Sequence, residues 1–151
     1  MQLIKKIFIY IFFLLVSFNV ETIEKEIFLS LKYNKVNVRY GPGKTYPVKY
    51  VYKKKNLPVK IIDEKENWRR IIDHQYNSGW IQLSQLKSSN SFIILEDKIL
   101  FKKSTLFSKP ILKLKKGRLL LIKNCKKEWC KVETDNYSGW IKNTNIWGNI
   151  K

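Results

Sequence analysis

The chain has few of the side chains that usually perform catalysis or hold metals. Its 151 residues include one histidine, two cysteines and only 12 acidic residues. A Cys-His hydrolase would need a free thiol near His74, which lies in the turn-rich stretch DHQYN, far in sequence from both cysteines. The acidic residues lie mostly in turns, where carboxylates are normally solvated. These scarcities predict a protein that is not an enzyme and holds no metal or cofactor.

Long hydrophobic runs are absent except near the N-terminus. Residues 7–18, IFIYIFFLLVSF, are apolar; they follow Lys5 and Lys6 and precede the polar stretch NVETIEKE. This order is typical of a secretory signal peptide, and the apolar run is short for a membrane span. Ser17 is the only small residue near its end, so an uncleaved membrane anchor is the alternative. We expect residues 1–20 to be a signal peptide. The protein should then be exported to the periplasm, and its mature chain should have no transmembrane span.

The two cysteines, Cys125 and Cys130, enclose only four residues in CKKEWC. An even, close pair in an exported chain indicates a disulfide. A zinc site would need four ligands, and the single histidine lies in the other half of the chain. A redox-active pair usually has two intervening residues instead of four. We therefore predict a structural disulfide between these cysteines.

Basic side chains are abundant by contrast. The chain carries 26 Lys and 4 Arg, and its formal net charge is +18. Such an excess favours association with polyanions, nucleic acid included. The same bias towards Lys, Ile and Asn is also what AT-rich coding produces. The charge alone therefore leaves polyanion binding open without establishing it.

A repeat of about sixty residues accounts for nearly all of the chain after the N-terminal segment. Trp68 matches Trp129, and SGWI at 78–81 matches SGWI at 138–141. Upstream, LPVKII at 57–62 matches RLLLIK at 118–123. The polar stretch KSSNS at 87–91 lies between the copies and is expected to be a short linker.

Each copy is rich in short alternating or β-branched segments separated by turn residues. Such segments predict strands, and many short strands with glycine-marked turns predict a small barrel. We expect an all-β protein with two tandem five-stranded barrels over residues 28–87 and 92–148, and one 3₁₀ turn in LSQL (83–86). The expected core residues are Val38, Val59, Ile61, Ile71 and Ile81 in the first copy, and Leu100, Leu120, Ile122, Val132 and Ile141 in the second.

The motifs of the first copy resemble those of the bacterial SH3-like (SH3b) domain, in the exported two-repeat type of Gram-negative bacteria. The matching stretches are VNVRYGPG (36–43), YPV (46–48), LPV (57–59), NWRRI (67–71) and GW (79–80). In the second copy they are CKKEWCKV (125–132), NYSGW (136–140) and IWG (146–148). The second copy departs from the pattern at 102–109, where KKSTLFSK replaces YGPGKTYP. The resemblance implies SH3-like barrels and a domain that binds rather than catalyses.

The loop that contains Gly41, Pro42 and Gly43 is the candidate ligand surface. Proline fixes φ and glycine adopts conformations closed to other residues, so a shaped turn is expected. It is no phosphate-binding P-loop, because YPVKY follows GKT where a helix would have to begin. The resemblance implies attachment to peptidoglycan or to an envelope protein. Candidate ligand-binding residues are Arg39, Tyr40, Tyr46, Tyr50 and Trp68.

Two other functions are compatible with these residues. Basic barrels that carry aromatic side chains also bind single-stranded nucleic acid, although export argues against that partner. A purely structural role in a protein complex is the third hypothesis. For Trp80 and Trp140 we favour a packing role, whereas for Tyr40 and Tyr46 packing and ligand binding are both open.

Overall fold

The computed structural model describes residues 25–150, which form two β-sheets. The predicted signal peptide, residues 1–20, lies outside the described residues. The strands of the first sheet are β1 (Phe28–Leu31), β2 (Val36–Arg39), β3 (Val48–Tyr52), β4 (Pro58–Lys65), β5 (Trp68–Ile72), β6 (Ser78–Gln82) and β7 (Leu86–Ser88). Those of the second are β8 (Ser91–Ile94), β9 (Lys98–Phe101), β10 (Pro110–Leu114), β11 (Leu119–Lys126), β12 (Trp129–Thr134), β13 (Tyr137–Lys142) and β14 (Ile146–Trp147). The expected 3₁₀ turn is η1 (Leu83–Gln85).

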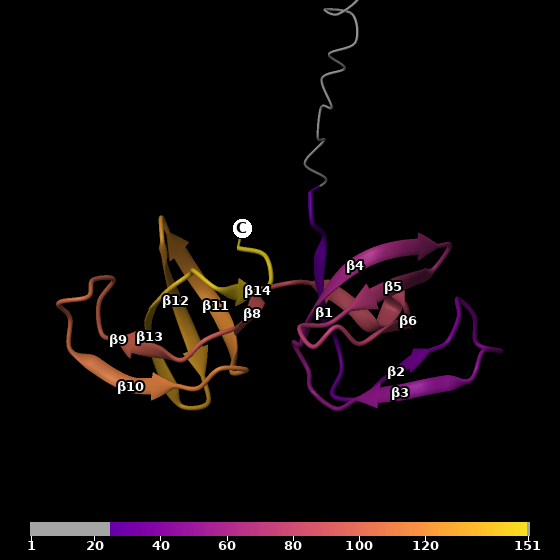
Figure 1. Cartoon of the computed structure of the whole chain (residues 1–151), viewed down its shortest axis with the longest axis horizontal. Coiled ribbons are helices and arrows are strands. Elements are labelled where there is room, and N and C mark those ends of the chain that lie inside the picture. Colours follow the sequence, from indigo (N-terminus) through magenta and orange to yellow (C-terminus); the bar gives the residue numbers. More distant parts are fainter. Residues whose placement is uncertain (1–24, 151) are drawn as a thin grey trace, which may run out of the picture.

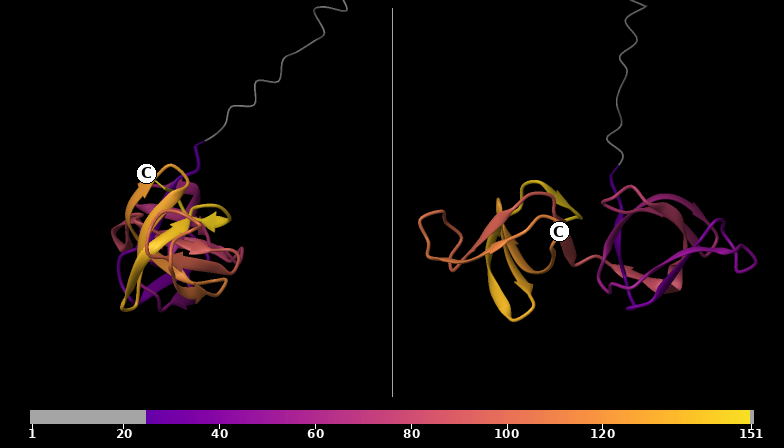
Figure 2. Two further views of the ribbon diagram at one scale, coloured as in Figure 1. Left: turned by 90° about the vertical axis from the view of Figure 1, so that its left-hand side faces the viewer. Right: turned by 60° about the horizontal axis from the view of Figure 1, so that its bottom comes forward.

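The two sheets have the same topology. Their strand orders are β3-β2-β6-β5-β4-β1-β7 and β10-β9-β13-β12-β11-β8-β14, with every pairing antiparallel. Each sheet curls around its own interior, and the two barrel-like units lie side by side along the long axis (Figures 1 and 2). The prediction of an all-β tandem repeat is confirmed. Each unit has seven strands because β1 and β7, or β8 and β14, add to the five expected ones.

Alternation along the strands buries one face of each sheet. The expected core residues Val38, Val59, Ile71 and Ile81 are fully buried in the first unit, as are Leu100, Leu120, Val132 and Ile141 in the second. Ile61 and Ile122 are only partly buried, which corrects the prediction for both. Each of the two directly precedes the bulge at which β4 or β11 shifts register against its neighbour. Because a bulge redirects side chains locally, alternation stops predicting burial there.

The segment between the sheets is not a free linker. Only Ser89 and Asn90 separate β7 from β8. The Ser89 hydroxyl lies 3.0 Å from that of Ser30, which in turn lies 3.0 Å from that of Ser91; all three serines are buried. The three serines therefore form hydrogen bonds with one another inside the molecule, whereas the polar sequence pattern suggested an exposed linker.

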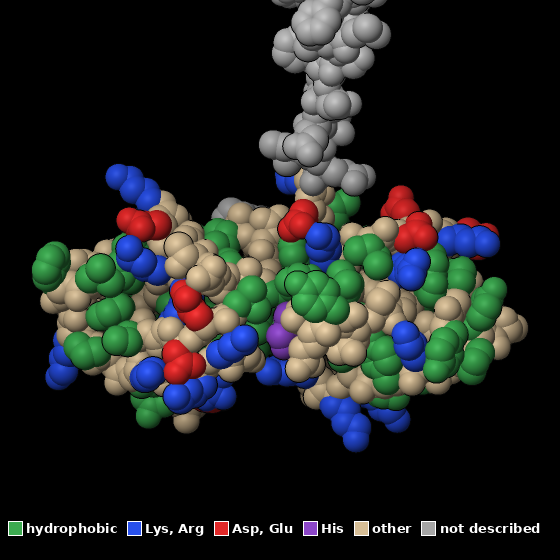
Figure 3. Space-filling model, in the orientation of Figure 1, with side chains coloured by type: hydrophobic (Ala, Val, Ile, Leu, Met, Phe, Trp, Pro, Cys, Tyr) green, Lys and Arg blue, Asp and Glu red, His purple; other side chains and the backbone are tan. Residues whose placement is uncertain are grey.

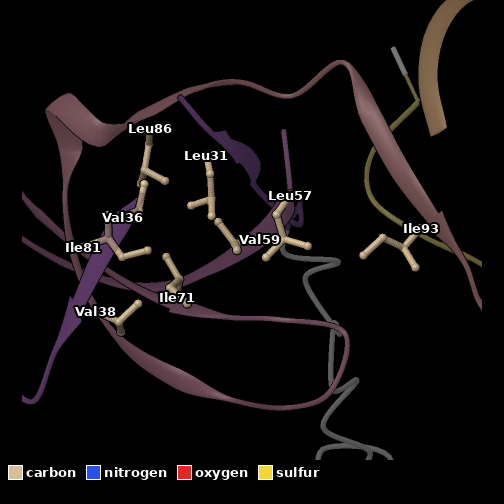
Figure 4. Packing of buried hydrophobic residues seen from close by; sticks show 9 residues of the cluster. All are labelled: Leu31, Val36, Val38, Leu57, Val59, Ile71, Ile81, Leu86 and Ile93. Atoms are coloured by element: carbon tan, nitrogen blue, oxygen red, sulfur yellow. The ribbon is translucent and has the colours of Figure 1, made fainter. Parts of the chain in front are cut away.

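Strand β8 also contributes to both hydrophobic cores. Phe92 and Ile94 belong to the second core, whereas Ile93 packs in the first. Figure 4 shows Ile93 approaching the first core on the side of Leu57 and Val59. Adjacent residues of a strand point to opposite faces, so one strand can serve two cores. The two units therefore share packed apolar surface.

The tips of β4–β5 and β11–β12 occupy equivalent places in the two sheets. Glu64 is paired with Arg69 across the first hairpin, and Cys125 with Cys130 across the second. The predicted disulfide joins Cys125 and Cys130, whose Cα atoms are 4.0 Å apart. At the same position in the first unit, Arg69 Nε lies 3.2 Å from Glu64 Oε2. The first repeat thus closes this hairpin with an ion pair and the second closes it with a covalent bond.

Within residues 25–150, no helix has the length and apolar character needed to cross a membrane.

Candidate functional site

The loop between β2 and β3 is held by its own backbone. The Tyr40 N–H donates to the Pro47 carbonyl at 3.3 Å, and the Gly43 N–H donates to the Gly41 carbonyl at 3.0 Å. Arg39 adds a side-chain bond, since its Nη1 donates to the Tyr46 carbonyl at 2.7 Å. Tyr40 and Tyr46 remain 63% and 46% exposed. The loop is therefore ordered while presenting two aromatic side chains to solvent.

The glycines of this loop serve a different purpose from the one expected. Neither Gly41 nor Gly43 has a positive φ, so the backbone does not require glycine there. Instead, a Cβ on Gly41 would lie 2.4 Å from two ring carbons of Tyr46. The Tyr46 ring packs directly on the Gly41 backbone, and any side chain at that position would displace it. The prediction that these glycines adopt special conformations is therefore wrong.

Beside this loop, three neighbouring strands place a tryptophan between two arginines. In the register of the first sheet, Arg39 on β2 is opposite Trp80 on β6, and Trp80 is opposite Arg70 on β5. Residues directly opposite one another on adjacent strands share a face of the sheet, so the three side chains form a row. The register shift between Val38 and Arg39 makes Lys49 of β3 the extra residue at the end of the row. The Lys49 ammonium donates to the Ser78 carbonyl at 2.9 Å and lies 5.6 Å from the centre of the Tyr40 ring.

These side chains line an open hollow of about 310 Å³. Its lining combines three cations, Arg39, Lys49 and Arg70, with the aromatic rings of Tyr40 and Trp80 and the backbone of Ser78 and Gly79. No acidic residue of the described chain lines it. Arginine and lysine donate hydrogen bonds to carboxylates and phosphates, and aromatic faces stack on flat or ring-shaped apolar surfaces. The hollow can therefore hold an anionic ligand that also has a ring or apolar face.

Both repeats match one known protein family. Residues 32–87 and 100–148 each match the model of the bacterial SH3 domain. The chain belongs to the bacterial SH3 domain family. The family resemblance inferred from the sequence is thereby confirmed. Bacterial SH3 domains are typically binding modules, not catalysts.

Solved structures give a weaker likeness. The chain is similar to NlpC2 and NlpC1 from Trichomonas vaginalis, at 11% and 10% identity, and to an NlpC/P60 family protein from Bacillus cereus, at 11%. The TM-score is 0.38 in all three; 85%, 83% and 80% of this chain are covered. The corresponding shares of those chains are 50%, 47% and 55%, so this chain spans about half their length. No curated protein matches the sequence.

The second SH3 repeat has the same loop backbone but different side chains. Its β9–β10 loop repeats the bonds of the first, with the Lys102 N–H donating to the Lys109 carbonyl and the Thr105 N–H to the Lys103 carbonyl. Ser108 stands where the first repeat has Tyr46, so Lys103 can replace Gly41 without a clash. Ser108 Oγ also accepts a hydrogen bond of 2.8 Å from the Lys103 N–H. One loop conformation is therefore built from two different sets of residues.

The cationic row is not repeated in the second SH3 repeat. The registers of β9, β13 and β12 place Phe101 and Lys131 on either side of Trp140. The extra residue at the equivalent register shift is Ile111, where the first repeat has Lys49. Two of the three cations are thus replaced by apolar side chains. The hollow is a feature of the first repeat.

The structure separates the five candidate residues into two groups. Arg39 and Tyr40 line the hollow, and Tyr46 is bonded to Arg39 through its carbonyl. Trp68 is half-buried on β5 opposite Gln82 and is not among the residues that line the hollow. Tyr50 packs against the first core.

Tyr50 belongs to a partly buried chain of hydrogen-bonded polar groups. Its hydroxyl lies 3.3 Å from that of Tyr52, which donates to Asp73 Oδ2 at 2.8 Å. Burial raises the pKa of Tyr50, and burial together with these two neighbours raises the pKa of Tyr52. Both phenols are therefore protonated at neutral pH. Asp73 also accepts the N–H groups of Gln75 and Asn77, so this chain shapes the turn before β6.

Besides Ser78 and Gly79, three residues of the hollow were not among the sequence-based candidates: Lys49, Arg70 and Trp80. Arg70 and Trp80 alternate with the buried Ile71 and Ile81, so the strand pattern places both on the outer face. The strand pattern does not predict the register of β2, β6 and β5, and it is this register that places Trp80 and Arg70 beside Arg39. Comparing the two repeats position by position would have shown Lys49 as a difference, because the second repeat has Ile111 there.

Outside the hollow, the described residues contain one histidine and no cluster that could bind a metal ion. Among residues 25–150, no three His, Cys, Asp or Glu side chains gather in a way that could hold a metal ion. His74 is half-buried, and its burial lowers the pKa of the imidazole. Its Nδ1 is buried without a hydrogen-bond partner among the described residues. The ring is therefore neutral at physiological pH.

Proposed function

We propose that this protein is an exported, non-enzymatic binding module of the cell envelope that attaches to peptidoglycan through the first-repeat hollow. The two domains would span residues 28–87 and 92–148, with the protein in the periplasm. The observation that carries this proposal is the row of Arg39, Trp80 and Arg70, completed by Lys49 and Tyr40. The family assignment supports it, because bacterial SH3 domains are typically binding modules.

Peptidoglycan has both chemical features that the hollow suits. Its sugar rings offer apolar faces on which Tyr40 and Trp80 can stack. Its stem peptides carry carboxylates that Arg39, Lys49 and Arg70 can bind. An acidic envelope protein offers similar carboxylates but no sugar face. The aromatic part of the lining therefore favours the wall polymer.

Binding of a polyanion such as nucleic acid is the competing function, favoured by the net charge of +18. Polyanion binding depends steeply on salt, since it releases condensed counterions, and it uses cations wherever they lie on the surface. Peptidoglycan binding through the hollow depends on five particular side chains. Peptidoglycan binding should thus depend on residues in one place, whereas polyanion binding should depend on cations spread over the surface.

The experiment measures sedimentation of the protein with purified peptidoglycan sacculi. Tyr40→Ala/Arg70→Gln removes one ring and one cation from the hollow. Loss of one stacking contact and one charge-assisted hydrogen bond should weaken binding by roughly tenfold or more. Both side chains are exposed, so the melting temperature should change little.

The matched control is Lys102→Ala/Lys131→Gln, which alters the equivalent positions of the second repeat and should bind like the unmodified protein. Equal weakening by both variants, together with a steep salt dependence on DNA, would favour the polyanion function. Unchanged sedimentation of a folded Tyr40→Ala/Arg70→Gln variant would refute binding through the hollow.

A further inference from the structure

The β9–β10 loop of the second repeat ends in an exposed apolar tip. Phe107 is 100% exposed and Leu106 is 60% exposed. Ile99 and Ile111, on the two strands that carry the loop, are also exposed. In Figure 3, hydrophobic side chains gather at the left-hand end of the molecule, where Figure 1 places this hairpin. Large apolar side chains that gather on a surface usually mark an interaction site.

The fold does not require these apolar residues. The equivalent loop of the first repeat has the same backbone hydrogen bonds, and its residues in place of Leu106 and Phe107 are Lys44 and Thr45. A polar tip is therefore compatible with this loop conformation. The phenylalanine makes no contribution to the core and exposes its whole surface to water, which is unfavourable unless something covers it.

Backbone hydrogen bonds nevertheless order the β9–β10 loop. The Ser108 N–H donates to the Thr105 carbonyl at 3.2 Å, and the Lys102 N–H donates to the Lys109 carbonyl at 3.0 Å. Because these bonds close the loop beneath the tip, Leu106 and Phe107 stand out from a structured base. Little conformational entropy is lost when such a tip is inserted into another phase.

Three lysines flank the tip in the sequence. Lys102, Lys103 and Lys109 are exposed, and within the described chain none of them takes part in an ion pair. Between Asp97 and Glu128 the sequence has no acidic residue. An apolar tip flanked by cations matches the interface of an anionic bilayer, where acyl chains lie beneath negatively charged headgroups. An apolar protein groove would not need the lysines.

We propose that the β9–β10 hairpin binds the surface of an anionic lipid bilayer by inserting Leu106 and Phe107 among the headgroups while Lys102, Lys103 and Lys109 bind phosphates. The β2–β3 and β9–β10 loops lie at opposite ends of the long axis (Figures 1 and 2). One end of the protein can thus bind a membrane surface while the other end binds a second partner. The lipid site is independent of the proposed peptidoglycan site and can be tested without it.

The experiment is co-sedimentation with vesicles of phosphatidylglycerol and phosphatidylcholine, compared with vesicles of phosphatidylcholine alone. All strands of both sheets lie within residues 25–150, so a chain that begins at Lys25 keeps the described fold and omits the apolar N-terminal run. We expect binding to the anionic vesicles only. Leu106→Ser/Phe107→Ser should weaken it about tenfold or more, because it removes the inserted apolar surface.

Two further variants distinguish insertion of the tip from other causes of vesicle binding. Tyr76→Ser/Tyr137→Ser removes two exposed aromatic side chains elsewhere and should leave vesicle binding unchanged. Lys102→Gln/Lys103→Gln/Lys109→Gln should reduce the preference for anionic lipid. Binding that persists in folded Leu106→Ser/Phe107→Ser, or no binding by the unmodified chain, would overturn the proposal; the latter would favour a protein as the occupant of the tip.

Discussion

At the scale of single residues, the two repeats show how one backbone can be stabilised by different side-chain pairs. Gly41 accommodates the ring of Tyr46, whereas Lys103 is accommodated because Ser108 is small and binds its N–H. Each residue is explained by its partner across the loop and not by its own conformational preference. Pairs of this kind are coupled, so their changes should not be additive.

We expect Gly41→Ala to destabilise the protein by about 1–2 kcal/mol, because the new methyl group must displace the Tyr46 ring. In a Tyr46→Ser background the same change should have almost no effect, since φ at Gly41 is accessible to any residue. Chemical denaturation of the four variants measures the coupling. An equal destabilisation in both backgrounds would show that Gly41 is required by the backbone after all.

At the scale of elements, the hairpin tips of β4–β5 and β11–β12 provide an internal comparison. Both have the same register and the same bulge, but one is closed by Glu64 and Arg69 and the other by Cys125 and Cys130. Glu64 is exposed and Arg69 is partly exposed, and an ion pair at such a surface position contributes at most about 1 kcal/mol. Closure of this short loop by a disulfide contributes about 2 kcal/mol in the chain-entropy model.

Reduction of the disulfide, or Cys125→Ser/Cys130→Ser, should therefore lower the free energy of unfolding of the second repeat by about 2 kcal/mol. Glu64→Cys/Arg69→Cys should form a new disulfide in the first repeat, because the register is the same. Alkylation of free thiols under denaturing conditions, before and after reduction, counts the bonds. Free thiols in the oxidised double-cysteine variant would show that the two hairpin tips differ in geometry.

The strands and the core could be predicted from the sequence because they depend on local alternation. The repeated SGWI, the paired tryptophans and the alternating apolar residues were sufficient for the fold. The bulges were not visible, and they are what leave Ile61 and Ile122 partly buried and bring Lys49 into the hollow. A bulge changes the register by one residue, and no local pattern in these strands marks its position.

At the scale of the whole molecule, the two repeats are joined by more than the chain between them. The Trp147 indole N–H donates to the Pro58 carbonyl at 3.1 Å, and its ring meets that of Phe28 edge-on at 5.3 Å. Ile93 adds apolar contact with the first core. This interface could not be predicted from the sequence, because its residues come from segments far apart and the polar KSSNS stretch suggested a linker. The contacts imply that the repeats behave as one rigid body.

Trp147→Ala removes both the hydrogen bond and the aromatic contact between the repeats. We expect the free energy of unfolding to fall by about 2–3 kcal/mol. This is a small decrease for a large aromatic side chain, because Trp147 is only half-buried. Calorimetry should show one transition for the unmodified protein and two for the variant. Tyr137→Ala, at an exposed position, is the control. One unshifted transition in both proteins would mean that Trp147 does not couple the repeats.

Binding through the hollow can be tested directly by an NMR titration of the isotope-labelled protein with soluble peptidoglycan fragments that contain sugar and stem peptide. Because the two loops share a backbone conformation, the second repeat serves as an internal control within the same sample. We expect the amide shifts to be concentrated at Arg39, Tyr40, Lys49, Arg70 and Trp80, while the signals of Phe101, Lys102, Ile111, Lys131 and Trp140 stay unchanged. Equal shifts in both repeats, or none in the first, would contradict it.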